Sequence, residues 1–314
     1  MAVPEAPSGS PQAGALHSLD HVIVAVSNLE AATGATARLL GRRPSWRGEH
    51  PRAGTSNTLF RLANTSLELL CPSGEGPLAR VLEAWIEARG EGLLGMAFGS
   101  DDAEACRARL AAAGLEPEAI ENGLGRDVDS GAYRQWRRLP LPLARTRGVP
   151  LFAIQHSSPP ELLPPATAFA AEPSTVFALD HVVVLSGDPE ASRAFYGDAL
   201  GLRLALDREF PSWGSRLVFF RVGGVTVEIA ARLTDASARE AGSQAPPPLP
   251  SLDADRLFGL SWRVRDAAAA RARLAELGFE VSELRPGRKP GTRVFSVRSG
   301  TCGVATLMLE PADP

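Results

Sequence analysis

The chain has 314 residues, of which 44% are hydrophobic and 22% are charged, and its formal net charge is −3. This length allows two domains, and the mild charge argues against nucleic acid or an anionic membrane as a partner. The three cysteines (Cys71, Cys106 and Cys302) lie far apart without a CxxC pair, which argues against a disulfide framework or a zinc finger. No apolar run is long enough to span a membrane and no signal-peptide pattern opens the chain, so we expect a cytoplasmic protein.

The first unit follows a lead-in of residues 1–15, which is rich in Ala, Pro, Gly and Ser and is predicted to be disordered. Residues 19–26 (LDHVIVAV) are predicted to be a strand with His21 on one face. A helix is expected next, with Ser27 or Asn28 as its cap and Gly41 as its stop. The helix and the three strands after it are predicted over residues 29–40, 43–48, 57–62 and 65–70.

A second unit of the same kind follows after an added helix over 77–90. Its strand, helix and later strands are predicted over residues 93–102, 102–113, 133–139 and 149–155, with a long basic loop over 140–148. Residues 157–175 contain five prolines, which resist helix and central strand, so this stretch is interpreted as a linker between domains.

The two halves of the chain repeat each other. Residues 19–70 lie over 179–230 without a gap at a shift of 160, and 16 of the 52 pairs are identical, too many for a chance match. The remaining units repeat at a shift of 164, and residues 232–256 are an insertion interpreted as a mobile loop. The predicted fold class is therefore α+β, with four βαβββ modules arranged in two pairs, which form two domains over 16–156 and 176–314.

The strand LDHVVV, the segment AFYGDALGLRLALD at 194–207 and the strand VTVEIA at 225–230 resemble the vicinal oxygen chelate superfamily. That superfamily includes glyoxalase I, extradiol dioxygenases, fosfomycin-resistance transferases and bleomycin-binding proteins. HPRAGTSN at 50–57 before SLELL at 66–70 is similar to glyoxalase-like domains. The resemblance implies that the four modules form two curled mixed-sheet half-barrel domains around a cavity, with metal ligands on the first and last strands of paired units.

Carried over to this chain, the resemblance places His21, His181, Glu68 and Glu228 at metal-ligand positions, 47 residues apart within each half. The second unit of each half departs from the pattern at both positions, where Gly95, Phe152, Gly259 and Leu307 stand. Each half thus keeps two ligands. Catalytic zinc takes three protein ligands and non-heme iron takes two His and one carboxylate.

Two ligands leave several interpretations open. The second half has no histidine besides His181, which disfavours extradiol ring cleavage, whereas the first half could recruit His50, His156 or Gln155. If units one and three faced each other, their two His and two Glu would make the set of a glyoxalase I. A divalent metal (Zn, Ni, Mn or Fe) and no metal at all are both compatible with this sequence. Without metal, each pair is either a buried relic or a dyad in which Glu orients His as a general base.

A second candidate feature is the basic turn RPGRKPGTR at 285–293, where Arg288, Lys289 and Arg293 could bind a carboxylate or phosphate. GLGRD at 123–127 is its shorter counterpart, and Arg216 is a further candidate for binding substrate. The alternative is an ordinary solvated basic loop.

The favoured function is that of a lyase- or isomerase-type enzyme acting on a small polar organic molecule through His181 and Glu228, with His21 and Glu68 as their counterparts. The alternative is a metal-free protein that sequesters a small molecule, as bleomycin-binding relatives do. A homodimer is compatible with either.

Overall fold

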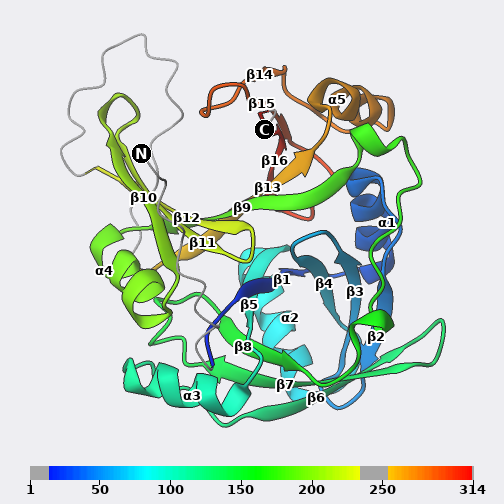
Figure 1. Ribbon diagram of the computed structural model, residues 1–314. Coiled ribbons are helices and arrows are strands. Elements are labelled where there is room, and N and C mark those ends of the chain that lie inside the picture. Colours follow the sequence, from blue (N-terminus) through cyan, green and yellow to red (C-terminus); the bar gives the residue numbers. More distant parts are fainter. Residues whose placement is uncertain (1–13, 234–253, 313–314) are drawn as a thin grey trace, which may run out of the picture.

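The computed structural model describes residues 14–233 and 254–312, which form two mixed sheets of eight strands (Figure 1). Most of the predicted disordered lead-in and most of the insertion predicted to be a mobile loop lie outside the described residues. The first half contains β1 (Ser18–Ala25), α1 (Leu29–Leu40), β2 (Trp46–His50), β3 (Thr55–Arg61), β4 (Ser66–Pro72), α2 (Pro77–Arg89), β5 (Gly92–Gly99), α3 (Ala103–Ala112), β6 (Glu121–Asp127), β7 (Tyr133–Leu141) and β8 (Leu151–His156). The second half contains β9 (Val176–Ser186), α4 (Pro189–Arg193), a π turn (Ala194–Ala199), β10 (Arg203–Phe210), β11 (Ser215–Val222), β12 (Val225–Arg232), β13 (Arg256–Val264), α5 (Ala267–Glu276), β14 (Arg285–Pro286), β15 (Arg293–Val297) and β16 (Ala305–Glu310).

The first sheet closes into a barrel with the order β1-β4-β3-β2-β6-β7-β8-β5. The half-barrel predicted for residues 16–156 is therefore wrong, because β2 pairs with β6 and completes the ring. The strand β6 is formed by ENGLGRD, which the sequence suggested was a basic turn. Its glycines are required by packing: a Cβ at Gly123 would lie 2.1 Å from Nε1 of Trp136 on the neighbouring strand β7.

The second sheet stays open, with the order β10-β11-β12-β9-β13-β16-β15-β14. Its β14, the counterpart of β6, has only two residues. The shift of 160 between the halves is kept in the strand register, since His21 pairs with Ser66 and His181 with Thr226. Both histidines thus occupy the same position on the first strand of their sheet.

Helix α2 fills one end of the barrel, and Figure 1 shows it among the strands of the first sheet. It begins at Pro77, a favourable first helical residue, and stops before Gly90. Leu82 is 1% exposed and packs with Ile23 and Leu70 on the barrel's inner face. That end is therefore closed by apolar packing, and any ligand must enter from the opposite end.

The segment predicted to be a linker, 157–175, lies against the barrel at that opposite end. Leu163 packs with Trp46 and Leu59, and Nη1 of Arg61 donates to the carbonyl of Pro160 at 2.9 Å. Apart from two single 3-10 turns, the segment has no helix or strand. Its prolines therefore keep this segment extended, and it runs along the mouth of the barrel.

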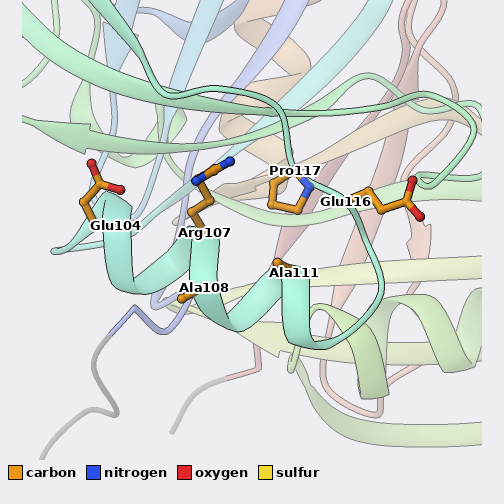
Figure 2. Close-up of a pocket in the computed structure, with 6 residues that line it drawn as sticks. All are labelled: Glu104, Arg107, Ala108, Ala111, Glu116 and Pro117. Carbon is orange, nitrogen blue, oxygen red and sulfur yellow. The ribbon is translucent and has the colours of Figure 1, made fainter.

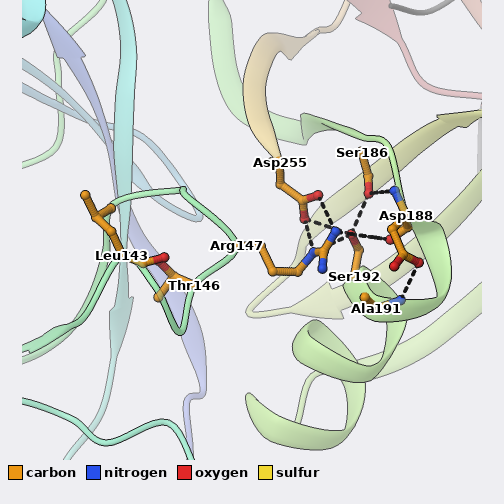
Figure 3. A network of polar contacts seen from close by, with 8 residues as sticks. All are labelled: Leu143, Thr146, Arg147, Ser186, Asp188, Ala191, Ser192 and Asp255. Atoms are coloured by element: carbon orange, nitrogen blue, oxygen red, sulfur yellow. Dashed lines mark hydrogen bonds and ion pairs between the residues drawn. The ribbon is translucent and has the colours of Figure 1, made fainter. Parts of the chain in front are cut away.

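The halves share one hydrophobic core, which includes Val22 and Phe98 from the first sheet and Val182 and Trp262 from the second. A polar network also joins them (Figure 3): Nε of Arg147 lies 3.0 Å from Oδ2 of Asp255, whose side chain is fully buried. Ser192 donates to the same carboxylate at 2.7 Å. Among the described residues, no helix combines the length and apolarity needed to cross a bilayer.

Candidate functional site

In the first half, the parallel pairing of β1 with β4 places His21 and Glu68 side by side inside the barrel. Nε2 of His21 lies 3.2 Å from Oε2 of Glu68, and its Nδ1 lies 2.7 Å from Oδ1 of Asp20. Asn57 donates from Nδ2 to Oε1 of Glu68 at 2.7 Å, and His156 contacts Asp20 at 2.9 Å. Both ring nitrogens of His21 are therefore held by carboxylates.

This arrangement fixes the charge of the first pair. Burial alone would lower the pKa of His21, but the hydrogen bonds to Asp20 and Glu68 and their charges raise that pKa to about 9. Burial likewise opposes ionisation of both carboxylates, yet the bonds from the imidazoles hold the pKa values of Asp20 and Glu68 below their usual range. Both ring nitrogens of His21 are engaged, and its raised pKa favours the protonated imidazolium at neutral pH.

In the second half, the equivalent pair is looser. Nε2 of His181 lies 3.5 Å from Oε2 of Glu228, and its Nδ1 lies 2.9 Å from Oδ2 of Asp180. Arg263 contacts the other oxygen of Asp180 at 2.7 Å; burial opposes ionisation there, but the bonds from His181 and Arg263 lower the pKa of Asp180 to about 2. The side chain of His181 is 18% exposed, against 10% for His21. The second pair is thus oriented by a carboxylate but is more accessible.

The surroundings of the second pair combine one cation with apolar groups. Nη1 of Arg288 lies 3.7 Å from Oε1 of Glu228, and its guanidinium lies 4.5 Å from the ring centroid of Trp213. The Trp213 ring stacks on Phe210 at 4.7 Å. Beside Glu228 on the same face of the sheet is an apolar cluster made by Val183, Leu185, Leu217, Phe219 and Ala230 together with Phe210.

The other predicted anion-binding residues have different partners. Arg293 lies 2.6 Å from Glu310, and Arg216 lies 2.7 Å from Asp207, so carboxylates of the chain already occupy both guanidinium groups. Lys289 is exposed in the turn beside Arg288. Of these four side chains, Arg288 is the one that reaches the His–Glu pair.

The described residues do not fit the family's metal site. Residues 14–233 and 254–312 contain no group of three potential metal ligands among His, Cys, Asp and Glu. The ring of Phe152 packs edge-on against His21 at 5.6 Å, where the resemblance calls for a carboxylate. A Cβ at Gly95 or Gly259 would lie 2.6 Å from a backbone carbonyl oxygen, so a histidine cannot stand there.

The pairing of units one and three, which would have combined both pairs in one site, is wrong. β1 pairs with β5 and β9 with β13, each within its own sheet. His21 and His181 therefore belong to separate sites.

A pocket of about 530 Å³ opens at the barrel mouth, and its lining includes Asp20, Arg61, Arg134 and His156. Sequence reasoning missed Arg134 and Asn57, because neither has a recognisable motif around it. Asp20 and Asp180 could have been recognised from the sequence, because an aspartate directly precedes the histidine in both repeats.

A second hollow, of about 470 Å³, lies on the outer surface of α3, where Figure 2 shows Arg107 between Glu104 and Glu116. The glutamates are paired with Arg137 and Arg145. This hollow contains none of the predicted site residues.

Three comparisons bear on these sites. The model of the family described as Glyoxalase-like domain matches residues 19–176 and 179–301. Ethylmalonyl-CoA/methylmalonyl-CoA epimerase from Cereibacter sphaeroides is 36% identical over 97 residues, which are 31% of this chain and 70% of that protein.

Among solved structures, a mutant of 4-hydroxymandelate synthase from Streptomyces coelicolor has a TM-score of 0.64 at 17% identity, covering 96% of this chain and 94% of that one. A hypothetical protein from Staphylococcus aureus has a TM-score of 0.58 at 10% identity, covering 92% and 97%. At such identities these likenesses concern the fold alone.

Proposed function

The chain belongs to the glyoxalase-like domain family, and from this premise we propose that it is an isomerase- or lyase-type enzyme that moves a proton on a small organic anion. In this proposal the open second sheet holds the active site, with Glu228 and His181 as the catalytic residues and Arg288 as the anion-binding residue. The family membership supports an enzyme-type activity, and the site residues are assigned from their geometry.

The observation that carries the proposal is the environment of Glu228. One of its oxygens faces His181 at 3.5 Å and the other faces Arg288 at 3.7 Å. Both contacts are longer than a good hydrogen bond, so the carboxylate is held in place without being saturated. In the first half, by contrast, Glu68 accepts a 2.7 Å hydrogen bond from Asn57 and lies 3.2 Å from His21.

The chemistry follows from this geometry. An anionic substrate competes with Glu228 for Arg288, whose side chain is 52% exposed and free to turn toward it. Glu228, released from its cation, can then accept the proton of a carbon next to a carbonyl group. The C–H bond breaks, its electron pair becomes the enolate, and a proton returned by His181 or by Glu228 completes the exchange. Trp213 and the adjacent apolar cluster would cover the uncharged part of the substrate.

The reaction class agrees with the relative from Cereibacter sphaeroides, whose name is that of an epimerase. Epimerisation removes and returns one proton and needs no oxidant or reductant. No step of this scheme uses a metal, because residues 14–233 and 254–312 contain no group of three potential metal ligands.

The test is deuterium incorporation in D2O, followed by mass spectrometry, with methylmalonyl-CoA, ethylmalonyl-CoA and a panel of small 2-oxo acids as probes. We expect exchange by the wild type that persists in a chelator. Glu228→Gln should lower the rate at least 100-fold, in line with the usual contribution of a general base. Glu68→Gln, the equivalent change in the first half, is the matched control and should retain most of the rate.

Equal losses in E228Q and E68Q, or exchange that a chelator abolishes, would contradict the proposal. Binding of a probe without exchange by the wild type would favour the alternative of a sequestering protein.

A further inference from the structure

We propose that the mouth of the closed barrel is a second ligand site, which binds a small organic carboxylate through Arg134. The pocket there has a volume of about 530 Å³, large enough for a small metabolite. It lies in the first sheet, away from His181 and Glu228, and none of the sequence motifs pointed to it.

Arg134 carries the inference. This residue is only 8% exposed, yet no carboxylate of the described residues lies within 4 Å of its guanidinium and none of them accepts a hydrogen bond from it. Burial lowers the pKa of Arg134, although the charges of Asp20 and Glu68 raise it from a distance. A buried cation that no carboxylate contacts directly is costly, since buried charges are normally paired and hydrogen-bonded. Arg147 shows the ordinary solution elsewhere in this chain, with Asp255 as its partner.

The shape of the site points to a planar anion. The guanidinium of Arg134 lies over the ring of Trp46, 5.3 Å from the centroid, which fixes its plane and leaves its N–H edges for a ligand. A carboxylate matches two parallel N–H donors of such an edge.

A second arginine, Arg61, and an aspartate that is already hydrogen-bonded, Asp20, also line the pocket. Arg61 uses Nη1 for the carbonyls of Pro160 and Leu163, and the remainder of its guanidinium has no partner among the described residues. Asp20 also lines the pocket, but its two oxygens already accept from His21 and His156. The acid is therefore occupied, and the cations dominate.

The rest of the lining mixes small polar side chains, among them Asn64, Thr65 and Ser66, with an apolar strip that can cover the hydrocarbon part of an organic ligand. Leu19, Leu62, Leu163 and the two prolines at 159–160 line the pocket. Gly223, from the hairpin between β11 and β12, contributes the rim, so a ligand here would touch both halves.

The experiment measures malonate binding by calorimetry and by thermal melting, at constant ionic strength set with NaCl. Wild-type protein should bind malonate and melt at a higher temperature with it. Arg134→Met should weaken binding at least tenfold, and Arg134→Lys, which keeps the charge but not the two-pronged edge, should weaken it less. Arg293→Met, a change at an exposed arginine already paired with Glu310, is the matched control and should bind as the wild type does.

Melting without malonate separates a ligand site from a structural role. If Arg134 is kept for a ligand, R134M removes an unpaired buried charge and should melt at the same or a higher temperature than the wild type. A lower melting temperature of R134M would show that Arg134 stabilises the fold, and would overturn the proposal.

Two further outcomes would also overturn it. One is loss of malonate binding in R288M instead of R134M, which would place the anion on the second sheet. The other is phosphate binding as tightly as malonate, which would rule out selection for an organic carboxylate. E228Q should bind malonate as the wild type does. The malonate site and the proposed activity can therefore be confirmed or refuted independently of each other.

Discussion

The charge of His21 makes a quantitative prediction about stability and pH. In the folded chain its pKa is raised to about 9 from an ordinary value of 6.5, and its side chain is only 10% exposed. A raised pKa stabilises the fold fully below pH 6.5, and that contribution disappears as pH rises through 9. Linkage gives a loss of about 2.5 kcal/mol between pH 7 and pH 10 from this one group.

The assay is chemical denaturation of the wild type and of His21→Gln at both pH values. At pH 7 the variant should be about 3–5 kcal/mol less stable, because Asp20 and Glu68 lose their common partner inside the barrel. At pH 10 the difference should shrink by about 2.5 kcal/mol, while titration of all other groups cancels between the two proteins. A difference that stays constant from pH 7 to pH 10 would refute the reasoning and would mean that His21 is neutral, hence available as a base.

Two other perturbations test what holds the fold together. Arg147→Gln should cost about 3–5 kcal/mol, since it leaves the fully buried carboxylate of Asp255 without its cation between the halves. Arg293→Gln breaks a solvent-exposed pair and should cost far less. Leu82→Ala should cost about 2–5 kcal/mol by opening a cavity where α2 plugs the barrel, whereas Val81→Ala, one residue away at 63% exposure, should change the free energy of unfolding by less than about 0.5 kcal/mol. Denaturation curves measure all four, and equal costs within either pair would contradict the assignment of burial.

The sequence was informative wherever a strong local pattern was repeated. The valine-rich strands around His21 and His181 predicted the two first strands. The family resemblance, which places the first and last strands of a unit side by side, predicted that each His would meet its Glu, at a spacing of 47 residues that recurs in both halves. The structure places both pairs as expected, at 3.2 and 3.5 Å. Strand β6 was missed because its glycines serve the indole of Trp136, a tertiary contact that leaves no local signal.

The difference between the two pairs also lay beyond sequence reasoning. Both histidines follow an aspartate and face a glutamate, so the motifs are alike. In the first half Asn57 and the closed barrel tighten the pair, whereas in the second half Arg288 and Trp213 arrive from distant loops. The tightness and exposure of each pair therefore depend on tertiary contacts that lie outside the repeated motif.

The openness of the second sheet has a consequence for how copies of the chain meet. A closed barrel has no edge strand. The open second sheet ends in β10, which pairs with β11 on one side, and no strand of the described residues pairs with its other side. This edge strand is exposed along nearly its whole length and carries Leu204 and Leu206, at 40% and 38% exposure. Exposed edge strands are templates for association, and two copies joined through β10 would extend one continuous sheet. The edge also carries Arg203, Asp207, Arg208 and Glu209, and charged side chains on an edge strand disfavour indiscriminate pairing.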